Sequence, residues 1–275
     1  MATPSSSPTA LERAAPLLRL PDAYDVTPVA HGDEIVDPRS GRRWRVVGGV
    51  LDLLGDRFAP TPTQRMLDTW VTAWLYDLLR DAVAPLVGMS DFENEARDAA
   101  GRLGLTRGDV VLDVACGHGN FTAALARVVG SEGLVIGVDI SAAMLARATD
   151  RVRREDLANV LLVRGDALRL PLAAGAVSKL ICSGGLHQLP DLERALSEFA
   201  RVLAPAGRLV ASGFAEGGEG SRGWRSSLRR WLALHVVPLA PLERALVAAG
   251  FDDVSTRTAG PVGYAWARRM AAPQP

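Results

Sequence analysis

The sequence predicts an α/β fold built on an open, doubly wound parallel sheet. Two observations predict it. Apolar, strand-like runs alternate with helical segments from about residue 109 to residue 214, which is typical of βαβ units that build a parallel sheet. The run 110–114 is almost continuously apolar, as expected of a central strand that is covered on both faces.

The expected core elements follow one another without a long break. They are strand 109–115, helix 121–129, strand 134–139, helix 141–154, strand 160–164, strand 177–182, helix 190–203 and strand 207–214. A helix over 91–103 precedes them, and the helix 241–250 follows with a glycine stop. Segments 251–258 and 262–268 are expected to pair as a terminal antiparallel hairpin.

The rest of the chain divides by composition. We expect a flexible tail over 1–16, a small β module over 17–60, a helical connector or cap over 61–90, and the main domain over 91–270 with a lid insertion about 215–240. In the module, the run 43–47 alternates polar and apolar residues after a turn-like Asp37-Pro-Arg-Ser-Gly41. The helical connector carries tryptophans and Tyr76 at helical spacing.

Composition excludes several classes of protein. The formal net charge is zero and the pI is about 6.9, so no strong electrostatic attraction to nucleic acid or to an anionic membrane is expected. Two cysteines build no disulfide framework, and no run is long enough for a membrane span. We expect a cytoplasmic protein with no metal site, because the four histidines have no metal-ligand spacing.

A glycine-rich turn after the first core strand carries the main functional signal. Asp113, Ala115, Gly117 and Gly119 form the pattern Asp-x-Ala-x-Gly-x-Gly, and Asp139 follows Gly119 by 20 residues. This spacing places a carboxylate where ribose hydroxyls bind in nucleotide-binding βαβ units. A dinucleotide site would need a third glycine, where Thr122 stands, and an acid at 113 would repel pyrophosphate. A ligand with a cationic amino end fits better.

The next helix is expected to begin at about Phe121. Asn120 and Thr122 are candidates for capping it, because short polar side chains accept from the first backbone amides of a helix.

These residues, with Val138–Met144, Arg164–Pro171, Ser183–Asp191 and Arg201–Val210, resemble the ordered motifs of class I S-adenosylmethionine-dependent methyltransferases. The resemblance covers about residues 91–270 and implies a Rossmann-like, seven-stranded sheet with S-adenosylmethionine as cofactor. The module at 17–60 resembles a zinc ribbon of some relatives, but it has no cysteine, so no metal is expected there.

The resemblance also implies a set of cofactor-binding residues. Asp139 would bind the ribose, Asp113 the amino group, and Ile140 and Met144 the adenine faces. For Ile140 and Met144, ordinary core packing is an open alternative. The further residues of the set are Ala115, Cys116, Gly117, His118, Gly119, Gly165, Asp166, Ala167, Ser183 and Gly184.

Two residues are candidates for catalysis. His187 follows the fourth core strand and could take a proton from an acceptor near neutral pH. Tyr76 resembles a tyrosine that lies over the cofactor. For each, a packing role is an open alternative, as it is for the acceptor-wall candidates Trp224 and Arg225.

The sequence thus favours methyl transfer to a small molecule, such as a specialised metabolite or a quinone-like acceptor, by in-line displacement. An RNA base methyltransferase and a non-methylating or regulatory relative that binds the cofactor stay open as alternatives. A monomer or a homodimer is expected, without membrane or nucleic-acid partners.

Overall fold

The computed structural model describes residues 8–54, 92–216, 237–259 and 262–271. The expected connector 61–90 with Tyr76, and the helix with Trp224 and Arg225, lie outside these residues. Within them, no helix combines the length and the apolar character that crossing a membrane requires.

The main sheet has five parallel strands and a terminal hairpin, as predicted. The parallel strands are β5 (Val110–Val114), β6 (Leu134–Asp139), β7 (Val160–Arg164), β8 (Val177–Cys182) and β9 (Leu203–Glu216). The hairpin strands β11 (Phe251–Ala259) and β12 (Val262–Arg269) run antiparallel, and β12 pairs with β9. The order β7-β6-β5-β8-β9-β12-β11 reverses at β5, which places a ligand-binding crevice beyond the carboxyl ends of β5 and β8.

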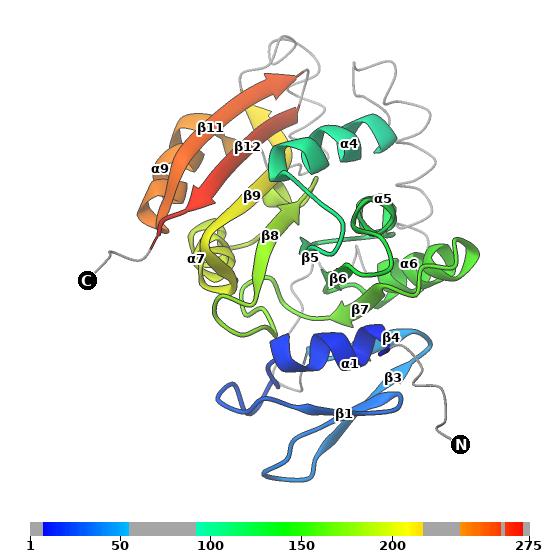
Figure 1. The fold of residues 1–275 in the computed structure, drawn as a ribbon. Helices are drawn as coiled ribbons and strands as arrows, with labels where there is room; N and C mark the ends of the chain where they lie inside the picture. The colour runs from blue at the N-terminus through cyan, green and yellow to red at the C-terminus, as the bar shows by residue number, and fades with distance from the viewer. Residues whose placement is uncertain (1–7, 55–91, 217–236, 260–261, 272–275) are drawn as a thin grey trace.

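Helices lie on both faces of this sheet (Figure 1). They are α4 (Phe92–Leu103), α5 (Asn120–Val129), α6 (Ala142–Arg154), α7 (Leu192–Val202) and α9 (Leu239–Ala248). Leu103 of α4 and Leu125 of α5 are buried in one apolar cluster, whereas Phe199 of α7 and Leu246 of α9 are buried in another. The sheet therefore separates two apolar layers, as expected when both faces are covered.

The first described residues differ from the prediction. The prediction of a flexible tail over 1–16 is wrong for residues 10–16, because the helix α1 (Ala10–Ala14) and the 3₁₀-helix η1 (Ala15–Leu17) form there. Thr9 and Glu12 make a reciprocal capping box at the start of α1, which satisfies two amides that would otherwise lack a partner. Leu11 is buried in the main core, so this short helix is held by packing.

Residues 29–52 of the expected small β module form four strands, which continue the main sheet. Strands β1 (Val29–His31), β2 (Glu34–Val36), β3 (Arg43–Val47) and β4 (Val50–Asp52) pair antiparallel in sequence. Strand β4 then pairs in parallel with β7, and the two-residue strand β10 (Val237–Pro238) joins the end of β9. The sheet thus has more strands than the seven predicted, because the module covers the edge that β7 would expose.

Tyr24 anchors this module to the main domain. Its hydroxyl oxygen lies 2.8 Å from the carbonyl oxygens of both Arg169 and Leu170, and the guanidinium of Arg169 lies over its ring. Burial raises the pKa of Tyr24 to about 12, so the hydroxyl stays protonated and able to donate. The described residues contain no cluster of His, Cys, Asp and Glu that could hold a metal ion, and the zinc-ribbon resemblance stays a prediction.

Candidate functional site

The turn after β5 bends through the left-handed region three times. Ala115, Gly117 and Gly119 have φ of 56°, 55° and 78°. A positive φ at a residue with a side chain costs about 1–3 kcal/mol and persists where the surroundings enforce it, so Ala115 marks a constrained position. The chain reaches α5 through this turn, as the glycine spacing predicts.

Gly117 and Gly119 are required for different reasons. A Cβ added at Gly119 would lie 3.0 Å from Ala148 Cβ and 3.2 Å from Ala148 Cα, so this glycine allows close packing of α6. A Cβ at Gly117 would meet no described atom within 4 Å. Open space beside a bare turn is what a ligand that approaches the backbone needs. Gly117 therefore borders the candidate binding crevice.

Asp139 joins the end of β6 to this turn. Its Oδ2 accepts from the Gly117 amide at 2.8 Å, and its Oδ1 accepts from the Ser141 amide at 2.8 Å. The cap of α6 is Ser141, whose hydroxyl accepts from the Met144 amide. The Asp139 carboxylate is half-buried, and a carboxylate has about four acceptor positions in all. The role of Asp139 as an acceptor for vicinal hydroxyls of a ligand stays a prediction.

Thr122 does not cap α5, and neither does Asn120. The helix begins at Asn120 with Gly119 as its N-cap and has no side-chain cap. The Thr122 hydroxyl instead donates to Asp113 Oδ2 at 2.6 Å. This hydrogen bond partly compensates a carboxyl group that is only 1% exposed, and the capping expectation is wrong because Asp113 competes for the hydroxyl.

Burial controls the ionisation of the groups beneath the turn. Desolvation raises the pKa of Asp113 to about 7, the Thr122 hydrogen bond opposes it, and the nearby Asp139 charge adds to it. Desolvation likewise raises the pKa of the Cys116 thiol well above its usual range. The Cys116 thiol is therefore neutral and acts as a small buried side chain, because only the thiolate is a strong nucleophile.

The adenine-side candidates lie at the carboxyl ends of β6 and β7. Ile140 and Met144 are partly exposed, which leaves apolar surface that a ring could cover. Asp166 Oδ1 accepts from the Leu168 amide at 2.9 Å, and Ala167 is half-buried between them. Gly165 is tight, since a Cβ there would lie 3.2 Å from Pro171 and Val138 side chains.

A residue of β9 that sequence reasoning missed lies beside the end of β8. Ser212 of β9 is 5% exposed. Its hydroxyl oxygen accepts from the Gly184 amide at 2.8 Å and lies 3.2 Å from the Ser183 hydroxyl oxygen. Gly184 has φ of 67° and open space at its missing Cβ. The one available signal was a lone polar residue after the apolar run Leu209–Ala211.

The two histidines of the candidate set are placed differently. His118 lies within the glycine turn and is 8% exposed. His187 lies in the 3₁₀-helix η3 (Leu186–Gln188), with its ring centroid 4.6 Å from that of Phe214. The Phe214 amide donates to His187 Nδ1 at 3.5 Å. These contacts fix the ring against β9, and a base role for His187 stays a prediction, as does any role of Tyr76.

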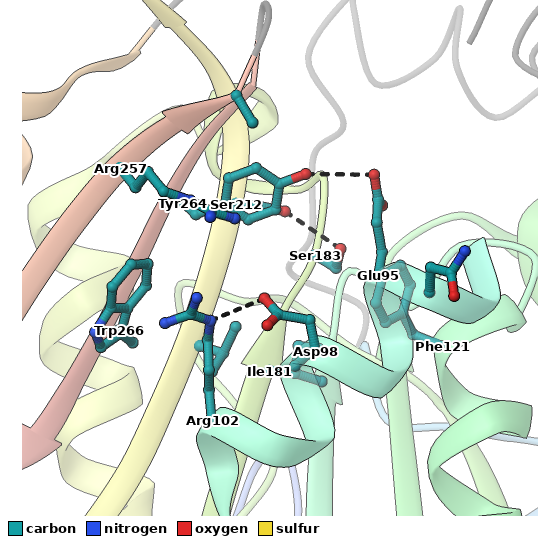
Figure 2. A pocket seen from close by; sticks show the side chains of 14 residues that line it. Glu95, Asp98, Arg102, Phe121, Ile181, Ser183, Ser212, Arg257, Tyr264 and Trp266 are labelled. Carbon is teal, nitrogen blue, oxygen red and sulfur yellow. Dashed lines mark hydrogen bonds and ion pairs between the residues drawn. The ribbon is translucent and has the colours of Figure 1, made fainter. Parts of the chain in front are cut away.

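A cavity lies beside Ser183, on the face of the sheet beneath α4, and we call it the sheet-face cavity (Figure 2). Its volume is about 180 Å³. Helix α4, the first residues of α5 and strands β8, β9, β11 and β12 supply its walls. The lining residues are Asn94, Glu95, Asp98, Ala99, Arg102, Phe121, Ile181, Ser183, Val210, Ser212, Arg257, Ala259, Tyr264 and Trp266. None of its walls was predicted as a site, except at Ser183.

Comparisons with known proteins find methyltransferases, in sequence and in fold. The family model described as "Methyltransferase domain" matches residues 111–207. A demethylmenaquinone methyltransferase of Shouchella clausii is 31% identical over 153 residues, which is 55% of this chain and 63% of that protein. A 2-phytyl-1,4-naphtoquinone methyltransferase of Synechococcus elongatus is 44% identical over 104 residues, which is 37% of this chain and 44% of that protein.

Among solved structures, phosphoethanolamine N-methyltransferase 2 of Haemonchus contortus superposes with a TM-score of 0.64 at 17% identity, covering 77% of this chain and 61% of that chain. This likeness shows the fold. The chain spans between 44% and 63% of the length of the two curated relatives.

Proposed function

We propose that the chain is a class I S-adenosylmethionine-dependent methyltransferase that transfers a methyl group from S-adenosylmethionine to a small-molecule acceptor. The match of residues 111–207 to a methyltransferase domain supports this proposal. The observation that carries the proposal is the Asp139 carboxylate, held 2.8 Å from the Gly117 amide at the edge of the open turn. When bound, the cofactor supplies an electrophilic methyl group on a sulfonium sulfur.

The residues of the turn fit the two ends of this cofactor. Asp139 would accept from the ribose hydroxyls. Gly117 leaves volume for the ligand, and Ala115, Cys116, His118 and Gly119 present backbone beside it. Gly165, Asp166 and Ala167 would face the adenine edge, Ile140 and Met144 its faces, and Ser183 and Gly184 the side towards the acceptor.

Asp113 suits the amino end of the cofactor. In the fold without ligand, the ionised carboxylate is costly, because burial raises its pKa to about 7. A nearby ammonium favours the charged form and lowers the pKa of a carboxyl group. Binding of the cationic amino group is therefore expected to release a proton from Asp113 near neutral pH.

Methyl transfer requires mainly that acceptor and sulfonium lie in line, because the methyl group is already activated. Holding two reactants in a near-attack geometry can supply about 7–11 kcal/mol of a barrier. A base is needed only for an acceptor of high pKa, and His187 is the candidate for it in the described residues. The names of the relatives favour a quinone-like acceptor.

The first test is calorimetric titration of S-adenosylmethionine and S-adenosylhomocysteine, with NAD as the negative control. We expect micromolar binding of both sulfur ligands, about −8 kcal/mol, and loss of at least tenfold in affinity in Asp139→Ala. Asp150→Ala is the matched control, because Asp150 is an exposed acid on α6. Binding of NAD, or of neither sulfur ligand, would refute the proposal.

Turnover is tested next, by following S-adenosylhomocysteine formation with reduced quinone-like acceptors and with RNA. Methylation of RNA alone would replace the small-molecule acceptor by the RNA alternative. Cofactor binding with no turnover on either class of acceptor would favour the regulatory, non-methylating alternative.

A further inference from the structure

We infer that the sheet-face cavity binds the acceptor, and that the Tyr264–Glu95 hydrogen bond opens to hold an acidic hydroxyl group on a flat aromatic ring. This inference rests on the proposed function and adds to it the chemical class of the acceptor. It is carried by the position, the size and the polar wall of the cavity.

The cavity lies next to the residues that border the cofactor crevice. Ser183 lines it at the end of β8, and Phe121 lines it one residue after the start of α5. Ser212, also in the wall, is the residue that accepts from the Gly184 amide. A molecule in the cavity would therefore sit against the same strand end that is expected to face the reactive part of the cofactor.

The floor of the cavity is apolar. Ile181 is 0% exposed, Val210 6% and Phe121 8%, and Ala99 is buried above them. The cavity volume of about 180 Å³ is comparable with the ~150 Å³ of a dry apolar cavity that accommodates benzene. One flat ring fits this space, and the rest of a larger acceptor, such as a fused second ring or a tail, extends out of it.

One wall consists of an arginine that forms an ion pair and also lies over a tryptophan ring. Arg102 Nε lies 2.8 Å from Asp98 Oδ2, and the guanidinium lies 3.9 Å from the centroid of the Trp266 ring. The ion pair and the ring contact together hold the Arg102 side chain in one position, and the Asp98 carboxylate compensates its charge. This wall therefore gives the ring of the acceptor a preformed flat surface to pack beside (Figure 2).

The opposite polar pair bridges the cavity and is long. Tyr264 Oη of β12 donates to Glu95 Oε1 of α4 at 3.3 Å, as Figure 2 shows. A hydroxyl that donates to a carboxylate normally lies about 2.5–2.7 Å from it. A hydroxyl group of the acceptor can replace this weak bond by two, since it accepts from Tyr264 and donates to Glu95.

The pair recognises a hydroxyl rather than an ether or a carbonyl. A carboxylate only accepts hydrogen bonds, so Glu95 needs a donor on the acceptor, which a methyl ether lacks. The Arg257 guanidinium, 5.8 Å from the centroid of the Tyr264 ring, adds a positive charge that favours the partial negative charge on the oxygen of a hydroxyl that stays protonated and donates to Glu95. An acidic, phenol-like hydroxyl satisfies all three side chains.

Calorimetry with 1-naphthol and 1-methoxynaphthalene as probes tests this inference on the full chain, with and without S-adenosylhomocysteine. We expect 1-naphthol to bind about tenfold more tightly than the ether, as one hydrogen bond to a charged group supports. Tyr264→Phe and Glu95→Gln should remove this preference while binding of the ether stays unchanged. A merely structural role of the pair would weaken both probes equally.

A blocking variant tests the position. Ala259 lines the cavity and is half-buried, so Ala259→Trp should weaken both probes at least tenfold. Met270→Trp is the matched control, since Met270 is 40% exposed and outside the cavity, and it should bind as the wild type does. Circular dichroism and the thermal midpoint verify that each variant is folded.

The outcomes separate the two proposals. Equal binding of the two probes by the wild type, absence of binding, or unchanged binding in Ala259→Trp would overturn the cavity assignment even if S-adenosylhomocysteine binds. Failure of S-adenosylhomocysteine to bind, with the naphthol pattern intact, would overturn the proposed function and support the cavity as a site for aromatic hydroxyls.

Discussion

Replacing Asp113 by asparagine should make the stability of the protein less dependent on pH. In the folded chain the pKa of Asp113 is raised from 3.8 to about 7, mainly by burial. Between these values the unfolded chain has lost the proton and the folded chain has kept it. The folded state then binds more protons, so its free energy of unfolding falls as the pH rises through this window and becomes level above pH 7.

The magnitude follows from the pKa difference. Each pKa unit corresponds to about 1.4 kcal/mol, so between pH 5 and the folded pKa of about 7 the wild type should lose about 3 kcal/mol through this group. The asparagine side chain does not ionise, and its amide oxygen can still accept from the Thr122 hydroxyl. Relative to the wild type, Asp113→Asn should therefore gain about 3 kcal/mol of stability on going from pH 5 to pH 8.

Urea unfolding at four pH values, without cofactor, measures this difference. Only the change with pH matters, because contacts that differ between Asp and Asn at all pH values cancel. Asp150→Asn is the control, since that exposed carboxylate should show the same pH dependence as the wild type. A stability difference between Asp113→Asn and wild type that stays constant from pH 5 to pH 8 would refute the reasoning.

The remaining predictions concern the turn, the core and the anchor of the module. Gly119→Ala should destabilise the fold by about 1–2 kcal/mol more than Gly117→Ala in thermal unfolding, because only the Cβ added at residue 119 meets Ala148, at 3.0 Å. Gly117→Ala should instead weaken binding of S-adenosylmethionine in calorimetry. Equal stability of the two variants would contradict this difference between the glycines. Phe199→Ala, at a fully buried position, should lower the free energy of unfolding in urea by about 3–5 kcal/mol. A loss below about 1 kcal/mol would mean that neighbouring side chains move in to fill the space that the phenyl ring leaves. Tyr24→Phe should cost about 1 kcal/mol through the lost hydrogen bonds to Arg169 and Leu170, with affinity for S-adenosylhomocysteine unchanged; a loss of that affinity would show that the module supports the cofactor site.

The central strands and helices were predictable because each is continuous in the sequence. Strands 134–139, 160–164 and 177–182 have the predicted bounds in the structure, since each is a short apolar run between turn residues. The helices are correct within two residues, as cap geometry moves their ends. Asp139 ends the predicted strand 134–139 and lies beside the glycine turn, because one βα unit fixes its spacing from that turn; its role in binding a ligand stays a prediction.

What failed depends on contacts between distant residues. The helix α1 is only five residues long, too short to be stable by propensity, and it forms because Leu11 packs in the core. Thr122 looks like a cap in sequence, but the buried carboxyl of Asp113 takes its hydroxyl. The sheet-face cavity could not be predicted, because its polar bridge joins Glu95 and Tyr264, which are 169 residues apart.

The parallel pairing of β4 with β7 has a consequence for synthesis of the chain. Asp52 and Arg164, which this pairing brings together, are 112 residues apart. A ribosome that adds about 5–20 residues per second needs roughly 6–22 s to cover that distance. During this interval β4 has been made and its partner strand does not yet exist, so β4 closes the edge of the sheet only after β5 and β6 have been made.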